Sequence, residues 1–188
     1  MTRPLDIWGN RVLAEAGAVL ARMPSDAHAP LARELAAARR IAVHSAGRTG
    51  LILRGLAMRL FHLGLDAHVV GDMTCPPLGS GDLLLVNAAT GDLPSGLAHI
   101  AAAKRAGARV AVVTAVPDGP AAHGADLVLH LPGQTMANDL GGAGGSALPM
   151  GSQYELALFV VCEVLVLELM DSRGVDFAAM RARHANLL

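Results

Sequence analysis

A chain of 188 residues is long enough for one domain with a sizeable core, and this chain is 53% hydrophobic but only 3% aromatic. Its 15 basic residues nearly balance its 16 acidic ones, and no run of Lys or Arg stands out, which argues against nucleic acid as a main partner. The two cysteines, Cys75 and Cys162, lack the spacing of metal ligands, so we expect free thiols in a reducing compartment.

The start of the chain is predicted to form two helices, because apolar side chains recur at helical spacing over 5–22 and again over 30–40. The apolar run 41–43 then has the composition of a buried strand. Small residues follow this run, and the next helix is expected to begin at Arg48 or Thr49.

The middle of the chain continues the alternation of strands and helices. A second strand is expected over 66–70, and the connection 72–81, rich in Pro and Gly, has little room for a full helix. The continuous apolar run 82–87 is typical of a central parallel strand that is buried on both faces. After another small-residue turn, a helix is expected over 94–107, with Pro94 in its first turn.

The last third of the chain supplies two more strands, expected over 109–114 and 126–131, with a loop between them. The glycine-rich stretch 139–151 is too flexible in composition for regular structure. A long apolar helix over 152–170 and a short one near the end follow. The most hydrophobic part of the long helix, 156–170, contains two glutamates and is too short to span a bilayer, so we expect a cytoplasmic protein with no membrane partner.

These elements predict a parallel sheet that helices cover on both faces, in one domain of residues 1–188. Leading helices (1–40) come before the sheet core (41–135), and C-terminal helices (152–188) follow it. Ligands of such sheets bind beyond the carboxyl ends of the strands, near the point where the strand order reverses.

Two small-residue turns, 45–49 and 88–92, both follow predicted strands and should therefore face the same crevice. In the first turn, a helix N-terminus would present free backbone N–H groups to an anion, with Arg48 as a nearby cation and Thr49 as a nearby hydroxyl. The alternative interpretation is an ordinary turn, with Thr49 as the N-cap and Gly47 easing the bend.

Four stretches together resemble the sugar isomerase (SIS) domain family, and within it the 6-phospho-3-hexuloisomerases. They are residues 46–50, 58–64, 69–71 and 149–155, and the likeness covers nearly the whole chain. The resemblance implies a three-layer α/β/α sandwich of the flavodoxin-like kind, with a five-stranded parallel sheet. It also implies an isomerase that converts a 3-hexulose 6-phosphate to fructose 6-phosphate through an enediol, without a metal or an organic cofactor. Members of the family commonly form dimers or tetramers.

The resemblance implies Glu155 as the catalytic base and His62 as an auxiliary acid or base. The residues that it assigns to the sugar phosphate are Ser45, Gly47, Arg48, Thr49, Thr90 and Gly91. From spacing alone, Ser152 and Glu155 could instead form a capping box, and a histidine on an apolar helix is more often simply buried. Arg48 could also pair at the surface with Asp72 or Asp92. The other histidines have no metal-binding arrangement, so no metal site is expected.

The turn after the third predicted strand departs from the family pattern. Family members usually carry Ser-Gly-Ser-Gly-x-Thr there, whereas this chain has Ala-Ala-Thr-Gly-Asp-Leu at 88–93, and Asp92 adds a negative charge beside the presumed anion site. Two alternatives therefore stay open. One is a non-catalytic sugar-phosphate-binding module with a regulatory or structural role, and the other is an isomerase of a different or unphosphorylated sugar.

The first helix and the last long helix carry more apolar surface than one sheet layer needs, for example at Ile7, Trp8 and Phe159. We therefore predict a homo-oligomer, a homodimer or homotetramer with the tetramer favoured.

Overall fold

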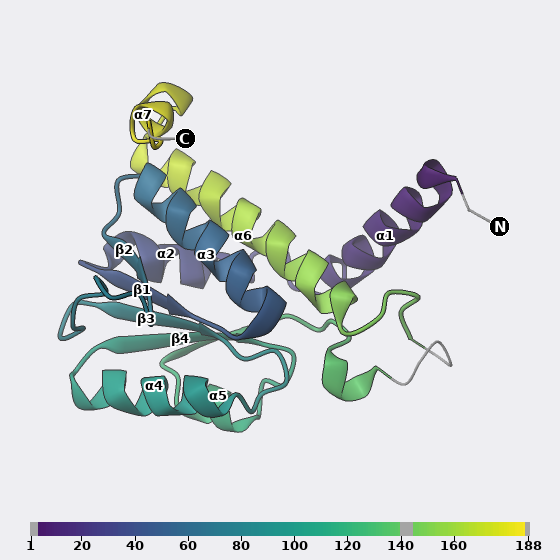
Figure 1. Cartoon of the computed structure of the whole chain (residues 1–188), viewed down its shortest axis with the longest axis horizontal. Coiled ribbons are helices and arrows are strands. Elements are labelled where there is room, and N and C mark those ends of the chain that lie inside the picture. Colours follow the sequence, from purple (N-terminus) through teal and green to yellow (C-terminus); the bar gives the residue numbers. More distant parts are fainter. Residues whose placement is uncertain (1–3, 140–144, 187–188) are drawn as a thin grey trace.

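The computed structural model describes residues 4–139 and 145–186, and within these ranges it contains one parallel sheet of five strands in the order β2-β1-β3-β4-β5. The strands are β1 (Ile41–His44), β2 (Ala67–Val69), β3 (Leu83–Asn87), β4 (Arg109–Thr114) and β5 (Leu127–His130). The predicted three-layer fold is confirmed. In Figure 1, α4 and α5 lie on one face of the sheet, and α2, α3 and α6 lie on the other.

The helices follow the predicted order, with small shifts at their ends. They are α1 (Leu5–Leu20), α2 (Ala29–Ala37), α3 (Gly47–His62), α4 (Pro94–Arg105), α5 (Pro120–His123), α6 (Ser152–Arg173) and α7 (Phe177–Ala182). The short helix α5 was not predicted, and neither was the 3-10 helix Met136–Asn138. Of the glycine-rich stretch 139–151, residues 140–144 lie outside the described residues, and 145–151 form no helix or strand.

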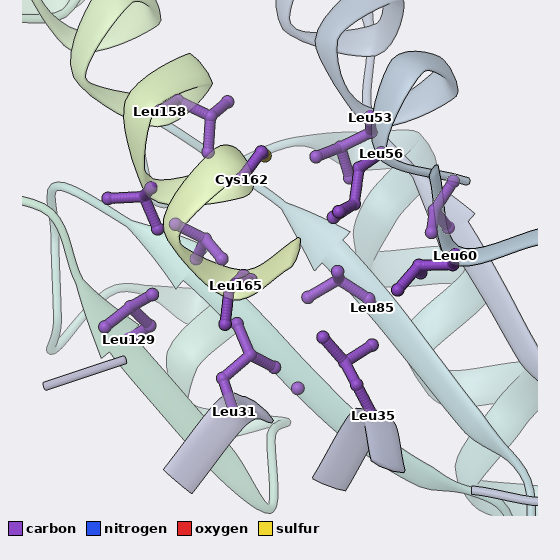
Figure 2. Close-up of a cluster of buried hydrophobic side chains, with 14 of the residues drawn as sticks. Leu31, Leu35, Leu53, Leu56, Leu60, Leu85, Leu129, Leu158, Cys162 and Leu165 are labelled. Carbon is purple, nitrogen blue, oxygen red and sulfur yellow. The ribbon is translucent and has the colours of Figure 1, made fainter. Parts of the chain in front are cut away.

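Strand β3 explains why the sheet has two cores. It is buried at every position, because it lies between β1 and β4 and helices cover both of its faces. Leu85 points into the larger core, whereas Leu84 and Val86 point into the smaller one against α4. Figure 2 shows side chains of α2, α3 and α6 converging on Leu85 and on Leu129 of β5.

The strand order reverses between β1 and β3. From β1 the chain passes through α3 to β2 at the edge of the sheet, and it then returns to place β3 on the other side of β1. The connection 70–82 contains no helix, as expected. The turns that leave β1 and β3 therefore flank the crevice in which ligands of such sheets bind. No helix in the described part of the chain is long and apolar enough to cross a membrane.

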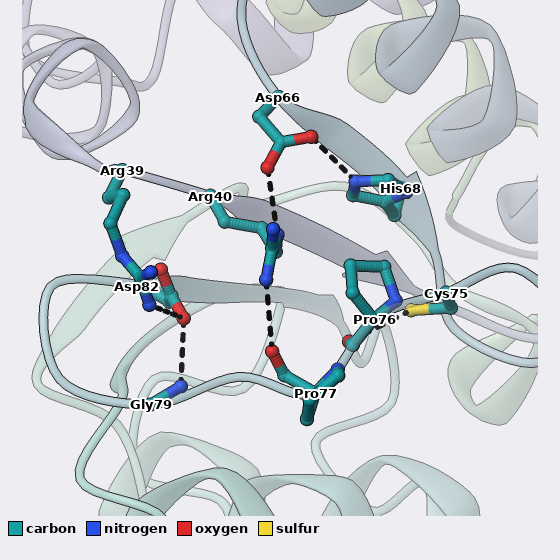
Figure 3. A network of polar contacts seen from close by, with 9 residues as sticks. All are labelled: Arg39, Arg40, Asp66, His68, Cys75, Pro76, Pro77, Gly79 and Asp82. Carbon is teal, nitrogen blue, oxygen red and sulfur yellow. Dashed lines mark hydrogen bonds and ion pairs between the residues drawn. The ribbon is translucent and has the colours of Figure 1, made fainter.

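A polar network closes the opposite, amino-terminal edge of the sheet (Figure 3). Asp82, whose side chain is fully buried, accepts hydrogen bonds from Arg39 Nη2 and from the backbone N–H of Gly79, both at 2.8 Å. Nearby, Arg40 pairs with the half-exposed Asp66 at 2.7 Å. Asp82 therefore fastens the helix-free connection before β3 to the end of the sheet.

We expect Asp82→Ala to lower the free energy of unfolding by about 2–3 kcal/mol, because it removes a buried carboxylate that accepts two hydrogen bonds. Urea unfolding measures this loss. The matched variant Asp66→Ala removes a carboxylate that is 45% exposed, and it should cost less than about 1 kcal/mol. Equal losses in the two variants would contradict the structural role given to Asp82.

Candidate functional site

The turn from β1 into α3 leaves a helix N-terminus open toward the crevice. Helix α3 begins at Gly47, whose φ of 59° lies in the left-handed region that favours glycine. The N-cap is Ala46, and within the described residues no side chain caps the helix. Thr49 is not the N-cap, because its hydroxyl donates instead to the carbonyl of Ala46 at 2.9 Å. The first N–H groups of α3 can therefore receive an anion.

A cavity of about 320 Å³ lies between the starts of α3 and α6, at the carboxyl ends of β1 and β3. Its volume is at the lower end of the range of small-molecule sites, which is about 300–1,000 Å³. The residues that line it are Ala46, Gly47, Arg48, Thr49, Ala89, Thr90, Thr135, Met136, Met150, Gly151, Tyr154 and Glu155.

Arg48 and Glu155 meet inside this cavity. Arg48 Nη1 lies 2.6 Å from Glu155 Oε2 and donates a hydrogen bond to Ser152 Oγ at 3.1 Å. The side chain of Glu155 is only 14% exposed, whereas that of Arg48 is 65% exposed. Arg48 therefore does not pair with Asp72, which instead contacts Arg54 at 3.1 Å. The cavity thus holds one carboxylate and one cation in direct contact.

The capping-box interpretation of Ser152 and Glu155 is wrong. Helix α6 has Gly151 as its N-cap, with φ of 76°, and within the described residues no side chain caps it. A Cβ atom at Gly151 would lie 2.8 Å from the backbone nitrogen of Met136, so this position accepts only glycine without a backbone shift. This turn aims the first residues of α6, Glu155 included, at the cavity.

A chain of buried and partly buried hydrogen bonds behind the cavity connects α6 to α3. The hydroxyl of Tyr154 donates to Asn87 Oδ1 at 2.6 Å, and Asn87 Nδ2 donates to Ser45 Oγ at 3.1 Å. Ser45 in turn donates to the carbonyl of Asn87 at 2.9 Å and lies 2.8 Å from the hydroxyl of Thr49. Burial raises the pKa of Tyr154 well above its usual value, so its hydroxyl remains a donor.

Sequence reasoning missed Asn87 and Tyr154. The available signals were a single amide at the end of an apolar strand and the only tyrosine of the chain. Ser45, which was predicted to contact the substrate, lies in this hydrogen-bonded chain and does not line the cavity.

His62 is not part of this cavity. It is the last residue of α3, and because a helix rises about 1.5 Å per residue, it lies roughly 20 Å from Gly47. The residue is 4% exposed, and its ring stacks on His184 with ring centroids 5.4 Å apart. Burial lowers its pKa, and Arg59 and His184 lower it further, so the ring stays neutral. The predicted meeting of His62 with Glu155 does not occur within one chain.

The turn after β3 contributes Thr90 to the cavity, but not Gly91 or Asp92. Gly91 is buried with φ of 79°, and a Cβ atom there would lie 2.7 Å from Cβ of Val116, so its role is to let two loops pack closely. Asp92 is exposed and lies outside the lining, so the predicted negative charge beside the anion site is not found there.

No group of three or more His, Cys, Asp or Glu side chains that could hold a metal ion occurs within residues 4–139 and 145–186. Cys75 and Cys162 are both free thiols. The chemistry that the cavity itself offers is therefore a carboxylate, a guanidinium, threonine hydroxyls and the N–H groups of a helix start.

Comparisons with known proteins give close matches. The chain is 40% identical to the 3-hexulose-6-phosphate isomerase of Mycobacterium gastri over 184 residues, which cover 97% of this chain and 92% of that protein. It is 35% identical over 157 residues to the 3-hexulose-6-phosphate isomerase of Bacillus subtilis (strain 168), with 84% of each covered. A solved structure from Methanococcus jannaschii, from which a 3-hexulose-6-phosphate isomerase function was inferred, is 27% identical with a TM-score of 0.79 and 98% of each chain covered. No protein-family model matches the chain.

Proposed function

Because the chain belongs to the sugar isomerase (SIS) domain family of phosphosugar isomerases, we propose that it interconverts a 3-hexulose 6-phosphate and fructose 6-phosphate. We assign the active site to the cavity between the starts of α3 and α6. The observation that carries this assignment is a largely buried carboxylate, Glu155, beside a cation, Arg48, at a helix N-terminus. The carboxylate can take a proton from carbon, and the cation and the helix start can hold a phosphate.

The reaction moves a carbonyl between two neighbouring carbons, and one base can serve both halves of it. From the 3-hexulose 6-phosphate, Glu155 removes the proton on C2, and the electron pair of that C–H bond forms the double bond of a 2,3-enediol as the C3 oxygen takes up a proton. Glu155 then returns a proton to C3, the proton on O2 leaves, and the carbonyl is now at C2. We propose that the hydroxyl of Thr90, which lines the cavity, passes the proton between the two oxygens.

The phosphate is expected at the first turn of α3. The unpaired N–H groups there, the guanidinium of Arg48 and the hydroxyl of Thr49 all suit an anion. The departure of residues 88–93 from the family pattern affects phosphate binding less than the sequence suggests. Two hydroxyl positions of the pattern are apolar in this chain, Ala88 and Leu93. Ala88 is buried in the smaller core, Leu93 packs against that core, and neither lines the cavity, whereas Thr90 keeps a hydroxyl residue there.

Proton NMR of fructose 6-phosphate in heavy water tests the proposal. With catalytic amounts of the protein, the signal of the C3 proton is expected to disappear while a new ketose accumulates, because the enediol takes up deuterium from solvent. Thermal stabilisation by the sugar phosphate without exchange would instead support the alternative, a binding module. Neither stabilisation nor exchange would direct the search to a different or unphosphorylated sugar.

We also propose that copies of the chain associate into a homodimer or homotetramer. Large apolar side chains remain exposed on two helices, with Leu5 at 87% and Leu13 at 71% on α1, and Phe159 at 52% and Leu167 at 58% on α6. Figure 1 shows the first half of α1 projecting from the rest of the molecule. Such surface is rarely left in water by a monomer, so a second copy is the occupant that we expect.

A further inference from the structure

In the cavity, the proposed base and the cation proposed to hold the phosphate are bound to each other. Arg48 Nη1 lies 2.6 Å from Glu155 Oε2, so no sugar carbon fits between the two groups. The same nitrogen donates to Ser152 Oγ at 3.1 Å, which keeps the guanidinium over the start of α6. With Arg48 in this position, Oε2 is not free to take a proton from a substrate.

The ion pair between Arg48 and Glu155 can be replaced by a contact between Arg48 and a phosphate. The side chain of Arg48 is 65% exposed, and an ion pair with one partner largely in water contributes little to stability. A phosphate offers more oxygens and more charge than one carboxylate, and a guanidinium binds phosphate through parallel hydrogen bonds. Arg48 is the second residue of α3, so a phosphate at the open start of that helix would be within its reach.

We propose that Arg48 is the specificity-determining residue of this site. In the empty cavity it is paired with Glu155, and the phosphate of the substrate draws it away and thereby frees the carboxylate to act as the base. This inference rests on the proposed function. It has a consequence for substrate choice, because a ketose without a phosphate can enter the cavity but leaves Glu155 paired with Arg48 for most of the time.

The test supplies the sugar and the phosphate as separate molecules. L-Erythrulose is an open-chain ketose with the C3 configuration of fructose, and deuterium uptake at its C3 in heavy water reports proton removal. We expect inorganic phosphate to raise this exchange by about two- to fivefold, the factor that corresponds to an ion pair with one exposed partner. Sodium chloride at the same ionic strength is the control for simple screening of the pair.

Two arginine variants on the same helix separate this role from general charge effects. Arg48→Gln should raise exchange without phosphate by about the same two- to fivefold and should abolish the response to phosphate. Arg54→Gln removes the same charge from α3, at a residue that pairs with Asp72 outside the cavity, and it should behave like the wild type.

The other possible results would contradict either the inference about Arg48 or the proposed function. If exchange in Arg48→Gln still responded to phosphate, the inference would be overturned. It would also be overturned if Arg48→Gln exchanged more slowly than the wild type without phosphate, because Arg48 would then hold Glu155 in place. Fructose 6-phosphate is included as a reference. If it exchanges with the wild type while phosphate has no effect on erythrulose, only the inference fails. If it does not exchange, the proposed function itself fails.

Discussion

Glu155→Gln is expected to lower kcat for isomerisation, and with it deuterium exchange at C3, by roughly 10²–10⁴-fold. Glutamine has nearly the same shape as glutamate, but it carries no charge and cannot take a proton from carbon. Because Glu155 lies at the cavity and outside both hydrophobic cores, the fold should be unchanged. Steady-state kinetics with fructose 6-phosphate, beside a far-ultraviolet circular dichroism spectrum, measure the two effects separately.

Glu163→Gln is the matched control, because it makes the same chemical change on the same helix, about two turns further from the cavity. It should leave kcat unchanged. If a folded Glu155→Gln variant retained most of the wild-type kcat, Glu155 would not be the base, and the isomerase mechanism would need another proton acceptor.

Asn87→Leu is expected to lower the free energy of unfolding by about 2–4 kcal/mol and the melting temperature by roughly 4–16 °C. Asn87 is 1% exposed and joins the hydroxyl of Tyr154 to that of Ser45, so its loss leaves the Tyr154 hydroxyl buried without an acceptor. kcat/KM should fall as well, because Tyr154 precedes Glu155 on α6 and its hydrogen bond fixes that helix start.

A double-mutant cycle with Tyr154→Phe distinguishes a lost hydrogen bond from a badly packed leucine. Tyr154→Phe alone should cost about 1 kcal/mol. The double variant should be destabilised by clearly less than the sum of the two single variants, because no hydroxyl is then left unpaired. Strict additivity in urea unfolding would show that packing, and not the hydrogen bond between the two residues, determines the loss.

The fold could be predicted from the sequence because its elements have strong local signals. The run 82–87 is apolar at all but its two ends, and the helix after it begins with Pro94 and ends near Gly107. Helix α5 was missed because four residues are too few to show a periodic pattern. The observed bounds of the strands differ from the predicted ones by a residue or two, because pairing with neighbouring strands, and not the local sequence, determines where a strand ends.

The candidate site was less predictable, because its contacts join distant parts of the chain. Arg48 and Glu155 are 107 positions apart, and nothing in either local pattern indicates that they form an ion pair. The same holds for the hydrogen bond between Tyr154 and Asn87. His62 follows the turn by only 15 positions in sequence, but a straight helix carries it roughly 20 Å from Gly47 within one chain, and the local pattern does not show this separation.

The burial of Tyr154 also determines what optical spectroscopy can report. This residue is the only tyrosine and Trp8 is the only tryptophan, and they lie in different places, one behind the cavity and the other on α1. Fluorescence excited where only tryptophan absorbs therefore reports the environment of α1. The near-ultraviolet circular dichroism of the phenol ring reports the packing of the cavity wall. One sample can thus be monitored for two separate things, changes in the surroundings of α1 and changes in the packing of the cavity wall.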